Sequence, residues 1–239
     1  MEQSNSKLLQ LLHVVIDNYI SKWEPIGSKF LASVEDEELD YAPSTLRKYL
    51  QQLEQGWFVY QPYKSSGRIP TVQWLSTYID EFIEQISTEE SLEHSSWDIL
   101  PYGFDLEMAR SSLKGITEQL GTMVDGVVVG FLSNDDYHYL GINNLLTEER
   151  ATTFGLMKYI VQFIEEKKIV KVLDAKLVKK WTMYYTFVQS EENVLSCVYI
   201  KLSINDYDAI ISIIWPSRVD YKKNLTVLQQ LIGIMGSVR

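Results

Sequence analysis

The chain has 239 residues, of which 46% are hydrophobic and 23% are charged, and its formal net charge is −10. The composition is that of a folded globular protein, and the length predicts one large domain or two small ones. The single cysteine, Cys197, excludes an intramolecular disulfide and a multi-cysteine zinc site, and the 3 separated histidines do not suggest a metal centre. We therefore predict no metal and no cofactor. With no apolar run of membrane-spanning length and no signal-peptide pattern, a cytoplasmic protein is expected.

The first part of the chain carries the pattern of three helices. Apolar residues recur at three- and four-residue spacing over residues 8–20, which predicts an amphipathic helix. Ser28 is expected to cap a short second helix over residues 29–33. A third helix is expected over residues 45–55. Its predicted buried stripe consists of three leucines at i, i+4 and i+7, namely Leu46, Leu50 and Leu53.

The third helix is followed by the pattern of a β-hairpin. Gly56 stands where a C′ glycine is expected, and aromatic and β-branched residues predict a strand over residues 57–60. A turn-rich loop over residues 61–68 leads to a returning strand, after which Thr71 is expected to cap another helix. The order helix, helix, helix, strand, loop, strand, helix predicts a winged helix-turn-helix domain over residues 1–86.

A polar stretch over residues 87–103, rich in Ser and Glu, predicts a linker. Residues 104–239 are expected to form a second, α+β domain, with helices flanking an antiparallel or mixed sheet. Its helices are expected over residues 106–123, within 153–173 and over 225–235, and its strands over 127–132, 181–188, 194–204 and 209–215. Phe154 is placed on the buried face of the middle helix. Cys197 lies in an apolar strand pattern, which favours a buried, inert thiol over a redox sensor.

Two surfaces of the second domain are candidates for a dimer interface. One is formed by the exposed apolar residues of the helix over residues 106–123. The other is the edge of the sheet near residues 194–204. The sequence does not choose between them.

Positive charge in the first domain is concentrated on the third helix and the following loop. Residues 41–71 hold four basic side chains and one acidic one, net +3, whereas residues 1–80 hold 7 basic and 10 acidic groups, net −3. A recognition helix needs polar, amide or guanidinium side chains that reach base edges, and a wing needs a basic, polar tip for phosphates. The helix candidates are Ser44, Thr45, Arg47, Lys48 and Gln51. The wing candidates are Tyr63, Lys64, Ser65, Ser66 and Arg68.

Two alternatives remain open for this region. Tyr63 is expected either to pack at the base of the wing or to contact a phosphate. The whole helix-turn-helix could also serve as a protein-interaction scaffold, with its basic residues forming a solvated face. No P-loop, nucleophile elbow or HExxH motif occurs in the sequence, so we do not expect an enzyme.

Several runs of the chain resemble one family. The amino-terminal domain of the HrcA family, the heat-inducible transcription repressors of bacteria, is similar to PIGSK (25–29), PSTLR (43–47), LEQG (53–56) and QPYKSSGRIPT (61–71). Weaker matches to later family motifs are GINNLL (141–146), EEN (191–193) and WPSRVDY (215–221). The chain departs from the family pattern at Lys48, Tyr63, Lys64 and Ser66, where the family usually has Asn, His, Thr and Ala.

This resemblance implies a GAF-like domain after the winged helix, in a shortened member that lacks most of the family's inserted dimerising domain. It implies a negative regulator of chaperone genes that binds an inverted-repeat operator, called CIRCE, as a homodimer. Heat or unfolded-protein stress would release it, with a GroE-type chaperonin as a further partner. The alternatives are a GAF-like regulator that senses a small molecule and a chaperonin-binding adaptor that has lost its DNA function.

Overall fold

The computed structural model describes residues 2–22, 24–34, 41–88, 105–132, 136–146, 154–173, 179–189, 194–204, 206–217 and 221–237. The chain divides into two compact units, Met1–Phe82 and Ile83–Arg239, and both combine helices with strands, as the predicted α+β class requires. All but the first two residues of the predicted linker, 87–103, lie outside the described residues. In the described ranges, no helix combines the length and apolarity needed to cross a bilayer.

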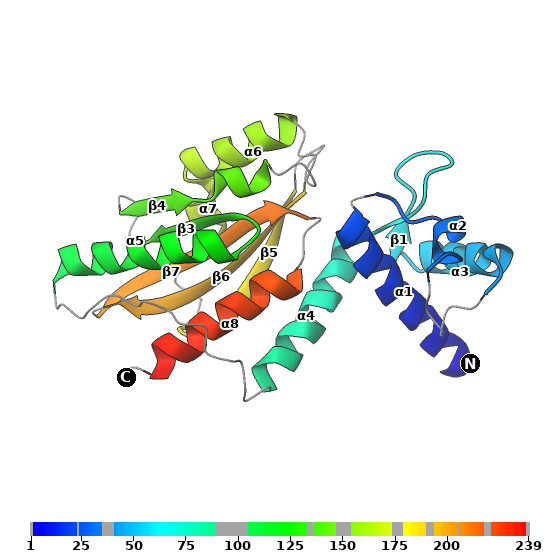
Figure 1. The fold of residues 1–239 in the computed structure, drawn as a ribbon, viewed down its shortest axis with the longest axis horizontal. Helices are drawn as coiled ribbons and strands as arrows, with labels where there is room; N and C mark the ends of the chain where they lie inside the picture. Colours follow the sequence, from blue (N-terminus) through cyan, green and yellow to red (C-terminus); the bar gives the residue numbers. More distant parts are fainter. Residues whose placement is uncertain are drawn as a thin grey trace. The chain divides into compact units, whose positions relative to one another are not determined.

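The first unit packs helices around a leucine-rich core and adds a two-stranded hairpin (Figure 1). Its elements are α1 (Glu2–Lys22), α2 (Ser28–Leu31), α3 (Pro43–Gln55), β1 (Val59–Tyr60), β2 (Ile69–Pro70) and α4 (Val72–Thr88). The fully buried core residues include Leu12, Val15, Ile16, Leu31, Leu46, Leu50 and Ile79. The predicted element order is confirmed, and so is the burial of the three leucines of α3.

Two polar contacts link α1 to α4. The hydroxyl of Tyr78 donates to Oδ1 of Asp17 at 2.7 Å, and Nε2 of His13 lies 3.1 Å from Oε2 of Glu81. The two helices that flank α3 and the hairpin in the sequence are therefore fixed to each other by side chains as well as by the apolar core.

The helix ends confirm one predicted cap and correct two others. Oγ1 of Thr71 accepts from N of Trp74 at 3.3 Å, so Thr71 caps α4 as predicted. Ser28 does not cap α2: it is the first residue of the helix and is buried, while the N-cap position belongs to Gly27. Gly56 is the C-cap of α3, and the C′ position predicted for it falls one residue later.

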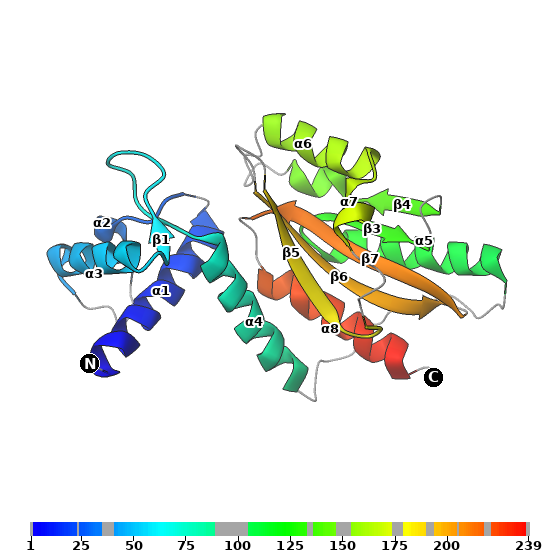
Figure 2. The ribbon, with the colours of Figure 1, turned by 180° about the vertical axis from the view of Figure 1, so that it is seen from behind.

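The second unit is a five-stranded antiparallel sheet with helices on both faces (Figures 1 and 2). Its helices are α5 (Leu106–Met123), the 3-10 helix η2 (Ile142–Leu145), α6 (Phe154–Glu165), α7 (Lys168–Val172) and α8 (Tyr221–Ser237). Its strands are β3 (Val127–Phe131), β4 (Tyr137–Leu140), β5 (Met183–Gln189), β6 (Val194–Ile204) and β7 (Tyr207–Pro216). The strand order is β4-β3-β7-β6-β5. Because β6 lies between β7 and β5, the expectation of a sheet edge at residues 194–204 is wrong.

Alternation along the strands separates the two faces of the sheet. Val127 and Val129 of β3 belong to the core that includes Ile160 of α6. Gly130, with the opposite orientation, faces α5. Phe154 was predicted to lie on the buried face of its helix, but its side chain is 85% exposed. The reason is its position: it is the first residue of α6, whose buried residues begin only at Ile160.

One asparagine connects η2 to the segment that joins α5 to β3. Nδ2 of Asn144 lies 2.9 Å from the carbonyl oxygen of Gly121 and 3.1 Å from those of Val124 and Gly126. The Asn144 amide therefore supplies a side-chain donor to backbone carbonyls of the last turn of α5 and of the segment that follows it. The GINNLL run therefore has a structural role within the second unit.

Candidate nucleic-acid interface

The start of α3 is open to an anion. Pro43 lies in its first turn, where its fixed φ favours helix formation. The N-cap residue is Ala42, which offers no side-chain acceptor, and no acidic residue lies in the first turn. The N-terminus of α3, with its partial positive charge, is therefore without an acidic or capping side chain of its own.

The face of α3 opposite the buried leucines is entirely polar. At about 100° per residue, four exposed side chains form a stripe along it. We call Ser44, Lys48, Gln51 and Gln55 the outer stripe. Arg47 is exposed beside it, and Thr45 is half-buried on the other flank. Four of the five predicted helix residues thus lie together on the exposed side, and Gln55, which the sequence argument did not include, extends the stripe.

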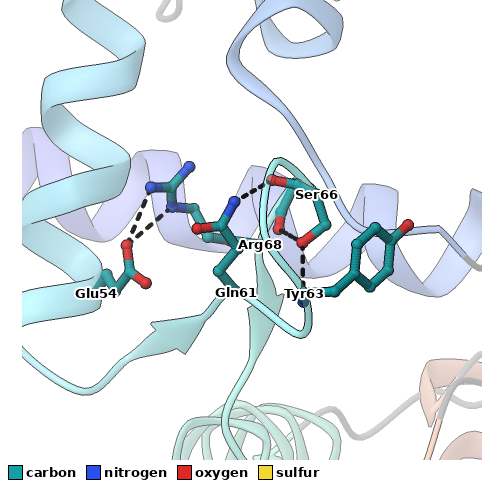
Figure 3. Close-up of polar contacts among 6 residues, drawn as sticks. Glu54, Gln61, Tyr63, Ser66 and Arg68 are labelled. Carbon is teal, nitrogen blue, oxygen red and sulfur yellow. Dashed lines mark hydrogen bonds and ion pairs between the residues drawn. The ribbon is translucent and has the colours of Figure 1, made fainter.

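The wing, residues 61–68, is held by hydrogen bonds within the loop (Figure 3). Oγ of Ser66 donates to the carbonyl of Gly67 at 2.8 Å and accepts from N of Tyr63 at 3.4 Å. Nε2 of Gln61 donates to the carbonyl of Ser66 at 2.9 Å. Ser66, predicted as a phosphate contact, therefore uses its hydroxyl to shape the turn. Gln61 is a positioning residue that the sequence argument missed.

Gly67 allows the wing to lie against the connector between α1 and α2. A Cβ atom at Gly67 would lie 2.4 Å from the carbonyl oxygen of Pro25. The adjacent residues exchange two backbone hydrogen bonds, from N of Ile26 to O of Arg68 at 2.9 Å and from N of Arg68 to O of Ile26 at 2.8 Å. The PIGSK and GRIPT runs, distant in sequence, thus form one antiparallel contact.

Arg68 points toward α3 and not toward the solvent beyond the wing tip (Figure 3). Its Nη2 and Nε donate to Oε2 of Glu54 at 3.0 and 3.3 Å, and its side chain is 13% exposed. This placement disagrees with the expectation that Arg68 contacts phosphate, because its guanidinium already has a carboxylate partner. The same bond neutralises the one acidic residue of α3.

The wing tip carries the remaining predicted residues. Tyr63, Lys64 and Ser65 are exposed, and 65% of the surface of Tyr63 is open to solvent. Such exposure does not fit the alternative in which Tyr63 packs at the wing base. In the part of the chain that is described, Arg47, Lys48 and Lys64 form no ion pair. Among the described residues, the net +3 of this region therefore corresponds to three exposed cations that are outside any ion pair.

Other chemical sites have little support in the described ranges. Cys197 is fully buried, and burial raises the pKa of its thiol to about 12, which confirms the predicted inert cysteine. No group of three or more metal-ligating side chains occurs among the described residues. Arg218 and Asp220 of the WPSRVDY run lie outside those residues.

No family model matches the chain. The amino-terminal third of the chain is similar to heat-inducible transcription repressors HrcA. The repressor of Shouchella clausii is 35% identical over 75 residues, that of Staphylococcus epidermidis RP62A 34% over 79, and that of Clostridium perfringens SM101 36% over 88. These matches cover 31%, 33% and 36% of this chain but only 21%, 24% and 25% of the respective relatives.

One solved structure has a similar fold along nearly the whole chain. It is the 2.2 Å crystal structure of a hypothetical protein, with a TM-score of 0.73 and 14% identity. The alignment covers 96% of this chain and 97% of that one. At this identity the likeness concerns the fold alone.

Proposed function

Since the chain belongs, through its amino-terminal third, to the HrcA family of heat-inducible transcription repressors, we propose that it represses transcription by binding double-stranded DNA. The observation that carries the proposal is the common exposure of Arg47, Lys48 and Lys64 on α3 and the wing. Within residues 41–71, all of which the structure describes, the single acidic residue, Glu54, is paired with Arg68. A phosphate backbone at α3 and the wing would therefore meet three cations and a neutralised pair.

The proposed roles follow from side-chain chemistry. Arg47 and Gln51 have the donor and acceptor groups that read base edges in a major groove. Ser44, together with the uncapped start of α3, suits a phosphate, as does Lys48. Lys64 and Ser65 at the wing tip would contact the backbone or the minor groove, with Tyr63 beside them. Thr45 is half-buried and would contact DNA only at the edge of the interface.

The remaining parts of the proposal rest on the family. We propose a homodimer that binds an inverted-repeat operator of the CIRCE type upstream of chaperone genes, because a two-fold dimer matches a palindrome. Residues 104–239 would form a GAF-like regulatory and dimerisation domain. A GroE-type chaperonin would be the partner through which heat or unfolded protein relieves repression in the cytoplasm.

A salt-titrated gel shift tests the proposal. The full chain is titrated onto a CIRCE-type inverted repeat, a single half-site and a scrambled duplex. We expect tight binding to the repeat, much weaker binding to the other two, and a steep fall of affinity with salt, since each phosphate contact contributes a slope of about 0.9. Equal, weak binding to all three duplexes would contradict the proposed operator. Absence of any binding at low salt would contradict the DNA function itself.

A further inference from the structure

The C′ position of α3, the proposed recognition helix, holds an unusual residue. N of Trp57 donates to the carbonyl of Glu54 at 3.1 Å, and N of Phe58 donates to the carbonyl of Leu53 at 3.0 Å. This is the Schellman arrangement, in which the C′ residue is left-handed and is usually glycine. Here Trp57 occupies it, with φ of 61°. Gly56, one position earlier, lies close to the ring of Phe58, which a Cβ atom at Gly56 would approach to 2.6 Å.

Trp57 is unfavourable to folding at this position in two ways. The left-handed conformation is destabilising for a residue that has a Cβ atom, whereas glycine adopts it without that cost. The side chain also gains little from burial, because 79% of its surface is exposed. The strain and the exposure of this aromatic side chain together point to a contact made outside the chain.

The position of Trp57 indicates what that contact is. A shallow hollow at the C-terminal end of α3 is lined by Gln51, Glu54, Gln55 and Trp57. Gln51 and Gln55 are the last two members of the outer stripe, so the indole continues the polar face that begins at Ser44. From Ser44 to Gln55 this face extends about 17 Å along the helix, at 1.5 Å per residue.

The charge around the hollow suits a polyanion more than an acidic or apolar protein surface. Of the described residues that line it, Glu54 alone is acidic, and Arg68 neutralises this carboxylate. The exposed cations nearest in sequence on the same helix are Arg47 and Lys48. A flat apolar ring at the end of such a surface fits deoxyribose or a thymine methyl group, which are the apolar parts of a DNA groove.

We propose that Trp57 is a DNA-contacting residue that extends the recognition surface beyond the helix, with its indole packed on a sugar or a thymine methyl at the edge of the major groove. This inference rests on the proposed function. It assigns to Trp57 a contribution to affinity that is independent of salt, because the contact is apolar and displaces no counterion.

Two substitutions separate this role from a structural one. Trp57→Ala removes the ring and keeps the left-handed strain, whereas Trp57→Gly removes both. If the ring contacts DNA, both variants lose about tenfold in operator affinity, with the salt slope of the wild type. The glycine variant should at the same time melt at the wild-type temperature or above. Phe154→Ala, which removes an aromatic side chain that is 85% exposed in the second unit, is the matched control and should bind as wild type does.

The other outcomes are distinguishable. Wild-type affinity in both Trp57 variants would overturn the inference and point to a protein partner for this surface. A loss in the alanine variant alone would also overturn it, because the glycine variant would then bind the operator without the ring. Failure of the wild-type chain to bind any duplex would overturn the proposed function first.

Discussion

Arg68 of the wing and Glu54 of α3 are joined by two hydrogen bonds to a single carboxylate oxygen, at 3.0 and 3.3 Å (Figure 3). This ion pair connects the wing to α3, the two elements that are proposed to contact DNA. It orients the wing relative to α3, and the preceding residue of the loop, Gly67, lies against the Pro25 connector. We therefore propose that Arg68 contributes to DNA binding by positioning the wing, and that Lys64 at the tip contributes through its charge.

The salt dependence of binding distinguishes these two roles. We expect Lys64→Met to reduce the salt slope by about 0.9, as the loss of one phosphate contact does. Arg68→Met should instead weaken binding at every salt concentration, by about fivefold, with the slope unchanged. This magnitude corresponds to an ion pair of about 1 kcal/mol that holds the wing in place. The measurement is a set of binding isotherms over a range of salt concentrations.

Glu54→Gln tests the positioning role of Arg68 from the side of its partner. Lys158→Met, which removes an exposed charge on α6, is the control and should bind as wild type does. If Arg68 positions the wing, removing the carboxylate weakens binding, because the guanidinium loses its anchor. If Arg68 instead contacted phosphate, removing the competing carboxylate would strengthen binding. A stronger complex with Glu54→Gln would therefore contradict the positioning role.

The close approach at Gly67 predicts a large effect from one methyl group. We expect Gly67→Ala to destabilise the first unit by about 1–3 kcal/mol, because its Cβ would meet the backbone of Pro25 and overpacking costs that much. Gly27→Ala is the matched control: it lies in the same connector, and a Cβ there would have no atom within 4 Å. Urea unfolding of both variants measures the difference. Equal midpoints would mean that the wing can move away from the connector without cost.

The sequence predicts this region well wherever local pattern decides the structure. The leucine spacing of α3, the cap at Thr71 and the polar loop are all local signals. For Arg68 the residue type predicts a phosphate contact, whereas its partner in the structure, Glu54, is 14 residues away and belongs to another element. Gly56 was predicted at the C′ position of α3, but it is the C-cap residue and the C′ position is taken by Trp57. Long-range partners of charged and small residues are not visible in periodicity.

The second unit has a polar contact whose removal should be costly. Asn144→Ala would leave the carbonyls of Gly121, Val124 and Gly126 without their side-chain donor. We expect a loss of about 2–3 kcal/mol in the unfolding free energy of this unit, as for buried polar groups left unsatisfied. Asn143→Ala changes the exposed neighbour and should cost little. A similar loss in both variants would show that η2 as a whole, and not the Asn144 amide, supplies the stability.

The single cysteine gives a probe of the second unit with a defined pH dependence. Burial raises the pKa of Cys197 to about 12, whereas an unfolded thiol titrates near about 8.5. Below the pKa of the unfolded state, the thiol is protonated in both states, so its titration does not lower the free energy of unfolding. As pH rises between the two values, only the unfolded state releases its proton, and the free energy of unfolding falls.

Two measurements check this expectation. Alkylation of Cys197 by iodoacetamide should be slow in the native protein and should accelerate together with unfolding, because the side chain is fully buried. Between about pH 9 and 11, wild type should lose more stability than Cys197→Ala, since the variant lacks the titrating thiol. Rapid native labelling, or the same alkaline loss in both proteins, would mean that Cys197 reaches solvent from the folded state.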